Sequence, residues 1–142
     1  MKTRANIRQR QIYWLDQCEP LDGDEEKDRP VIVLAAPETL RAADFILVVA
    51  CSTHPRERDI PRFEVPSRQQ AEETGLPKNC WAIARWYLKI NRFRLTQVKG
   101  TCPEPIFTPI LKAVLEQIDL DTNAAIATAL GEPRSIRSRG DS

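Results

Sequence analysis

The chain has 142 residues, of which 42% are apolar and 29% charged, and its formal net charge is +1. This length and composition fit one globular domain with a single core, and no apolar run is long enough to cross a bilayer. The small net charge excludes a global attraction to nucleic acid, so such binding must come from local patches. The first ten residues are basic but precede no apolar run, which argues against a secretory signal.

Short apolar segments predict strands along the first two thirds of the chain. The first is 12–15. The break after it is marked by Glu19-Pro20 and an acidic loop. The second is 31–34, which follows Arg29-Pro30, since proline is tolerated at the first residue of a strand. Residues 35–44 are interpreted as a connection. The other predicted strands are 45–51, which is apolar enough to be buried, and 62–65, 80–90 and 92–98.

Helices are predicted mainly towards the C-terminus. A short one is expected over 67–75, where Ser67 and Gln70 form a capping box and Gly75 is a terminator. Apolar residues at helical spacing predict a helix over 103–118, and an alanine-rich second helix follows from about 121 to 130. Five or six strands with late helices indicate an α+β, mainly β fold: a small, strongly curved barrel with helices packed outside it.

The four cysteines (Cys18, Cys51, Cys80 and Cys102) are widely spaced and form no C-x-x-C pair, and the chain has one histidine. This pattern argues against a zinc site, so no metal is expected. Without an export signal, reduced thiols in the cytoplasm are expected rather than disulfides.

Basic and aromatic residues are interleaved in one part of the chain. Residues 77–103 hold six lysines or arginines and no acid, together with four aromatic residues. Positive charge beside aromatic faces is typical of single-stranded nucleic-acid binding, through phosphate attraction and base stacking. The alternative is one or two ordinary strands with aromatics inward and cations outward. The candidate contacts in this stretch are Trp81, Arg85 and Lys89.

Arg29 is the first candidate for phosphate chemistry. It lies at the mouth of the apolar strand 31–34, where its planar guanidinium is well placed to hold a phosphate group. Lys27 precedes it as a further cation. The alternative is a surface loop whose charges are merely solvated.

The strand 45–51 leads into Ser52, Thr53 and His54. If strand alternation continues, Ser52 and His54 share one face, roughly 6.5–7 Å apart. A cation to hold a phosphate, one or two hydroxyls to orient it and a neutral imidazole to move a proton are a minimum set for phosphoryl transfer. The alternative is that the hydroxyls close the strand through local backbone bonds, with His54 an ordinary loop residue.

Taken together, the chain resembles the MazF/PemK family of toxin endoribonucleases of type II toxin–antitoxin systems. The resemblance spans roughly residues 10–118 and rests on the order of several short segments. These are 12–16, then Pro20, Gly23, Glu25, Lys27 and 29–34, then 48–53, 63–65, 75–81 and 94–95.

The resemblance implies a small SH3-like barrel that forms a homodimer and needs no metal or other cofactor. It implies cleavage of single-stranded RNA by attack of the ribose 2′-hydroxyl on its own phosphodiester, which leaves a 2′,3′-cyclic phosphate and a 5′-hydroxyl. Arg29 would stabilise the charge on the phosphate, Ser52 falls where the family usually has a catalytic threonine, and Thr53 is its polar neighbour. Glu25 falls in a loop that borders the RNA groove and the site of a cognate antitoxin.

Three departures from the family pattern stand out. Ser replaces Thr at position 52, Asp24 stands where one branch has a histidine, and Ile83 and Arg85 stand where that branch has an acid–base pair. His54 is therefore a candidate substitute for the proton carrier. A degenerate barrel that binds RNA or a protein target without cutting is the alternative function, and a structural module that pairs through the helix around 106–118 is a third.

The sequence thus predicts four segments. They are an N-terminal extension over 1–9, a barrel domain over 10–118, an additional helix over 119–131, and a disordered tail over 132–142.

Overall fold

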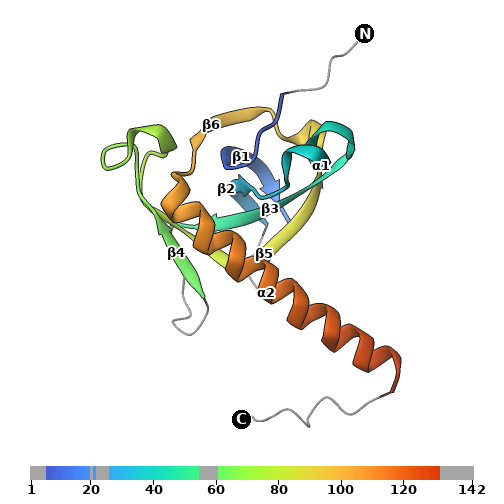
Figure 1. Ribbon diagram of the computed structural model, residues 1–142. Coiled ribbons are helices and arrows are strands. Elements are labelled where there is room, and N and C mark those ends of the chain that lie inside the picture. The colour runs from blue at the N-terminus through green and yellow to red at the C-terminus, as the bar shows by residue number, and fades with distance from the viewer. Residues whose placement is uncertain (1–5, 20, 22–25, 55–60, 132–142) are drawn as a thin grey trace.

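The computed structural model describes residues 6–19, 21, 26–54 and 61–131. They form one six-stranded antiparallel sheet in the order β4-β5-β3-β2-β1-β6, which curls into a half-barrel (Figure 1). The strands are β1 Gln11–Cys18, β2 Lys27–Val33, β3 Phe45–Ser52, β4 Arg62–Val65, β5 Cys80–Asn91 and β6 Gln97–Thr101. The helices are α1 Pro37–Ala42 and α2 Glu104–Ala129, with single 3₁₀ turns at η1 Glu72–Thr74 and η2 Arg92–Arg94. The predicted curved sheet with a helix packed outside it is confirmed.

The buried apolar side chains form two clusters, one on each face of the curled sheet. The inner cluster includes Val31, Val48 and Ala50 and is closed at one end by Leu40 of α1. The outer cluster includes Ile32 and Val49, and it is covered by Phe107, Ile110 and Val114 of α2. Because β2 and β3 are buried on both faces, their sequences are continuous apolar runs rather than alternating ones.

The prediction for residues 92–98 is wrong, because the chain turns before it forms the last strand. Residues 92–94 form η2, in which the Asn91 side chain accepts a hydrogen bond from the Phe93 backbone N–H (2.9 Å). The buried Arg92 side chain donates to the carbonyls of Leu40 (2.8 Å) and Ala43 (2.7 Å). Strand β6 therefore begins only at Gln97.

The connection predicted at 35–44 contains the short helix α1, which Pro37 begins and which buries Leu40. The helix predicted at 67–75 is instead a turn followed by η1. The hydrogen bonds observed here differ from those of the expected capping box. The Ser67 backbone N–H donates to Asn79 Oδ1 (2.6 Å), and the Gln70 backbone N–H donates to the Ser67 carbonyl (2.9 Å). Gly75 does end η1, with a left-handed φ of 66°.

The prediction of two C-terminal helices is also wrong, because α2 is continuous from Glu104 to Ala129. Asp121, interpreted as a helix start, lies inside the helix. Its carboxylate accepts hydrogen bonds from the Tyr87 hydroxyl (2.6 Å) and from Gln117 Nε2 (3.0 Å). Figure 1 shows the second half of α2 extending past the sheet. The predicted tail at 132–142 lies outside the described residues.

No described helix is both long enough and apolar enough to span a membrane.

All four cysteines are free thiols and all are buried. A hydrogen bond with the Cys80 thiol, together with burial, raises the pKa of Cys51 well above its ordinary value. Burial raises the pKa of Cys102 to about 12 and also raises that of Cys18. Because thiolates are the reactive form, we expect the burial of all four thiols, with the raised pKa values of Cys18, Cys51 and Cys102, to leave these cysteines unreactive in the folded protein.

A thiol titration tests this expectation. With a chromogenic disulfide reagent at pH 8, we expect essentially no rapid reaction of the native protein and reaction of all four thiols after unfolding in urea. Rapid labelling of any thiol in the native protein, identified by mass spectrometry, would contradict this.

Candidate functional site

A pocket of about 210 Å³ opens at the end of the half-barrel where β2 begins and β3 ends. Its walls come from four parts of the chain that are distant in sequence. They are Trp14 of β1, residues 27–30 of β2, residues 51–53 at the end of β3, and residues 76–78 with Cys80 before and at the start of β5. Four of the sequence-predicted residues, Lys27, Arg29, Ser52 and Thr53, therefore line one pocket.

Arg29 and Ser52 are brought together by the register of β2 and β3. Val31 pairs with Ala50 in this antiparallel ladder, and both belong to the inner cluster. Continuing the same register by two residues sets Arg29 opposite Ser52 on the same inner face. A guanidinium and a hydroxyl thus face the same small volume.

Arg29 is held in a buried position rather than on a solvated loop. It lies within β2 and is only 1% exposed. Its Cζ lies 4.5 Å from the ring centroid of Trp86, itself 6% exposed. This cation–π contact orients the guanidinium, and a cation shielded from water attracts an anion more strongly than a solvated one. The alternative of a merely solvated charge is therefore wrong.

Ser52 and Thr53 are tied to His54 by local hydrogen bonds. Ser52 Oγ accepts a bond from the His54 backbone N–H (3.0 Å), and Thr53 Oγ1 is hydrogen-bonded to His54 Nδ1 (2.9 Å). Ser52 is 6% exposed, whereas His54 is exposed and does not line the pocket. The predicted shared face of Ser52 and His54 is not formed, because β3 ends at Ser52 and the chain then bends.

Among the lining residues that were not assigned to the site from the sequence, the charged and aromatic ones are Lys78, Trp14 and Asp28. Lys78 adds an exposed cation, and Trp14 adds a half-buried aromatic ring. Lys78 reaches the pocket through the turn at Gly75, where a Cβ atom would meet the backbone carbonyl of Lys99. The glycine before Leu76-Pro77-Lys78 is the sequence signal that marks this turn.

The other predicted contacts lie outside the pocket. Trp81 is the cross-strand partner of Ser52, so it is adjacent to the site although it does not line it. Lys89 pairs with Leu47, five residues before Ser52 and roughly 17 Å away along the strand. Arg85 is exposed on β5 and does not line the pocket. Glu25 lies outside the described residues.

The position that carries an acid or base in one branch of the resembled family is filled by apolar packing here. Ile83 is buried in the inner cluster of the sheet. Within the described ranges, no group of three or more His, Cys, Asp or Glu side chains is placed to hold a metal ion. The chemistry available in the pocket is therefore that of three cationic side chains, two hydroxyls, the Asp28 carboxylate, two buried thiols and an aromatic ring.

The fold is a curled antiparallel half-barrel, and a buried arginine and a serine line a candidate phosphate site at its end. The chain belongs to the family described as PemK-like, MazF-like toxin of type II toxin-antitoxin system, whose model matches residues 8–118. The resemblance noted in the sequence is thereby confirmed. The match covers the whole sheet and the first half of α2.

Solved structures share this fold at low sequence identity. One is an endoribonuclease from a mycobacterial species, at 17% identity and a TM-score of 0.55, covering 93% of this chain and 98% of that chain. Another is the MazE-MazF structure from Deinococcus radiodurans, at 17% identity and a TM-score of 0.50, covering 91% and 100%. At such identity the likeness shows the fold alone. No match to a curated protein was found.

Proposed function

We propose that this protein is a toxin endoribonuclease that cleaves single-stranded RNA in the pocket lined by Arg29, Ser52 and Thr53. Membership of the toxin family supports the class of activity. The observation that carries the proposal is that the buried Arg29 and the Ser52 side chain line the same pocket. A cation held in this way can stabilise charge that develops on a phosphate in the transition state.

The proposed reaction needs no metal. The 2′-oxygen of the ribose attacks the adjacent phosphorus, its proton is released, and a 2′,3′-cyclic phosphate forms. The bond from phosphorus to the 5′-oxygen of the next nucleotide breaks, and that oxygen takes up a proton to leave as a 5′-hydroxyl. Arg29 holds the non-bridging phosphate oxygens, and Ser52 and Thr53 orient the phosphate. His54 is linked to both hydroxyls: its ring Nδ1 is hydrogen-bonded to Thr53 Oγ1, and its backbone N–H donates to Ser52 Oγ.

The remaining pocket residues fit an RNA strand. Lys27 and Lys78 are exposed cations at the pocket and contact flanking phosphates. Trp14 at the pocket, with Trp81 beside Ser52, provides rings for unstacked bases. The protein acts in the cytoplasm as a homodimer, and a cognate antitoxin covers the same pocket.

A second candidate function is a barrel that binds RNA or a protein target without cutting. It is favoured by the burial of Ile83 in the inner cluster, because that position cannot serve as an acid or base. The two functions differ in one outcome, the appearance of cleaved RNA.

The cleavage assay uses purified protein, free of antitoxin, and a long single-stranded RNA in EDTA. We expect discrete fragments whose 3′ ends resist phosphatase until acid opens a cyclic phosphate, and whose 5′ ends accept phosphate from a kinase without prior dephosphorylation. Intact RNA after incubation with folded protein would reject the nuclease, and retained RNA binding in the same sample would favour the binder.

Replacing the Ser52 hydroxyl tests its place in the reaction. We expect Ser52→Ala to lower the cleavage rate by about a hundredfold, because one preorganised polar contact to the phosphate is lost, and Ser52→Thr to retain activity. The matched variant Thr53→Val removes the neighbouring hydroxyl and its bond to His54. Equal rates for Ser52→Ala and the unmodified protein, measured under single-turnover conditions, would remove Ser52 from the mechanism.

A further inference from the structure

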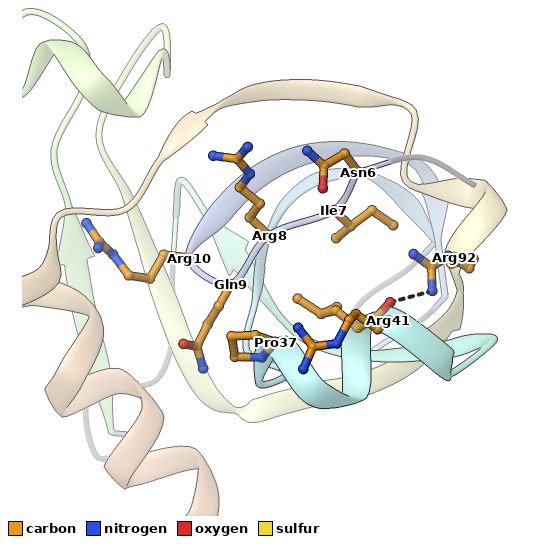
Figure 2. Close-up of a pocket in the computed structure, with 9 residues that line it drawn as sticks. Asn6, Ile7, Arg8, Gln9, Arg10, Pro37, Arg41 and Arg92 are labelled. Carbon is orange, nitrogen blue, oxygen red and sulfur yellow. Dashed lines mark hydrogen bonds between the residues drawn. The ribbon is translucent and has the colours of Figure 1, made fainter. Parts of the chain in front are cut away.

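A larger pocket of about 570 Å³ lies at the opposite end of the half-barrel, where β2 ends and α1 begins (Figure 2). It is lined by residues 6–10, by three residues of α1, and by Arg92. Arg29 and Val33 are separated by roughly 13 Å along β2, and α1 begins beyond Val33. The two pockets share no lining residue.

The lining of this barrel-end pocket is strongly basic. Four of its nine lining residues are arginines and none is acidic. The nearest carboxylates in the sequence, Glu38 and Asp44, are not part of the lining. Figure 2 shows Arg8 above the opening, Arg41 below it and Arg92 to one side. The four arginines are Arg8, Arg10, Arg41 and Arg92.

Two of these arginine side chains donate hydrogen bonds to backbone carbonyls, and the other two can bind a ligand. Arg92 fastens the end of α1 through the carbonyls of Leu40 and Ala43. Arg10 Nε donates to the Cys102 carbonyl (2.9 Å). Among the described residues, the exposed side chains of Arg8 and Arg41 make no hydrogen bond or ion pair.

The segment that carries Arg8 is fixed to the barrel. The Arg10 backbone N–H donates to the Val33 carbonyl (2.9 Å), and Gln9 Nε2 donates to the Leu34 carbonyl (3.0 Å). Ile7 is 5% exposed and packs in the inner cluster. Arg10 has a φ of 78°, a left-handed conformation that is strained for a residue with a side chain. The pocket is thus a built feature rather than a chance contact of a loose end.

We infer that the barrel-end pocket binds a phosphorylated nucleotide, with its phosphate held between Arg8 and Arg41. Guanidinium groups bind phosphate through planar, charge-assisted hydrogen bonds. Ile7, Leu40 and Pro37 supply an apolar wall for the base or the ribose. The volume falls within the range of roughly 300–1,000 Å³ that small ligands occupy. The nucleotide is either free or the phosphorylated end of an RNA strand.

Calorimetric binding tests this inference on full-length Ser52→Ala protein, in which we expect RNA cleavage to be about a hundredfold slower. We expect AMP to bind saturably and adenosine to bind at least about tenfold more weakly, because the charge-assisted phosphate contacts are absent. Arg8→Ala combined with Arg41→Ala should weaken AMP binding at least about tenfold. The matched control, Lys99→Ala with Lys112→Ala, removes two exposed charges elsewhere and should change it less than about twofold.

Three results would overturn the inference. They are no saturable AMP binding at millimolar concentration, equal affinity for AMP and adenosine, and unchanged AMP affinity in the Arg8 and Arg41 double variant. Circular dichroism of each variant establishes that the protein is folded.

Competition distinguishes the two sources of the nucleotide. If a 5′-phosphorylated RNA tetranucleotide displaces AMP and its 5′-hydroxyl counterpart does not, the pocket takes an RNA end. If neither displaces AMP, it takes the free nucleotide. RNA cleavage by protein with Ser52 intact is measured separately, so loss of the nuclease proposal would leave this inference standing, and the reverse also holds.

Discussion

Replacing Arg29 by lysine is expected to lower the rate of RNA cleavage by about a hundredfold or more. Lysine keeps the positive charge and a long stem, but it lacks the planar fork that holds two phosphate oxygens at once. Loss of one preorganised donor to a developing negative charge typically costs about 10²–10³ in rate. Single-turnover cleavage of a labelled RNA at saturating protein measures this effect on the chemical step.

The Arg29→Lys variant must also remain folded for the result to be informative. We expect the free energy of unfolding to fall by about 1 kcal/mol, because the guanidinium stacked over Trp86 is replaced by an ammonium. Urea unfolding provides the check. A folded Arg29→Lys protein that cleaves RNA at the original rate would contradict the assigned role.

The second large effect is expected on stability, at Gly75. Its φ is 66°, and a Cβ atom there would meet the backbone carbonyl of Lys99 on β6. Gly75→Ala therefore combines left-handed backbone strain with a clash against main chain that cannot rotate away. We expect the free energy of unfolding to fall by about 3 kcal/mol or more, measured by urea denaturation.

Gly131 offers a matched control for this prediction. Its φ is 79°, also left-handed, but nothing lies within 4 Å of a Cβ atom built there. Gly131→Ala should therefore cost only the backbone strain, roughly 1–2 kcal/mol. An equal fall in the free energy of unfolding for the two substitutions would show that the contact between Gly75 and the Lys99 carbonyl of β6 is not tight. Because Lys78 follows Gly75 closely, Gly75→Ala should also weaken RNA binding at the first pocket.

The sequence predicts best the strands that are buried on both faces, because each contains a continuous apolar run. The runs 31–34 and 45–51 are apolar on both faces, so β2 and β3 follow from composition alone. Helix α1 was missed because it has a single buried apolar residue, Leu40, among exposed ones. The break predicted in α2 was wrong because Asp121, which locally suggests a helix start, is bound to Tyr87 on the sheet.

The candidate site follows from the sequence only in part. Arg29 and Ser52 were selected by their residue types and by the family resemblance, but their opposition depends on the register of β2 and β3. Lys78 reaches the pocket through a turn that packs against β6, which no local pattern reveals. Lys89 was predicted as an RNA contact because it lies in the basic stretch 77–103. Its pairing with Leu47 places it far from Ser52.

The most direct test of the proposed site is to measure which arginine Nε–H signals shift when RNA binds. The measurement is the NMR signal of each arginine Nε–H group in protein titrated with an uncleavable 2′-O-methyl RNA of mixed sequence, with Arg29→Lys used to assign the Arg29 signal. We predict a saturable shift of the Arg29 signal as the phosphate enters the pocket beside Ser52. A bound RNA that moves the signals of Arg8 and Arg41 and leaves that of Arg29 unchanged would contradict the account.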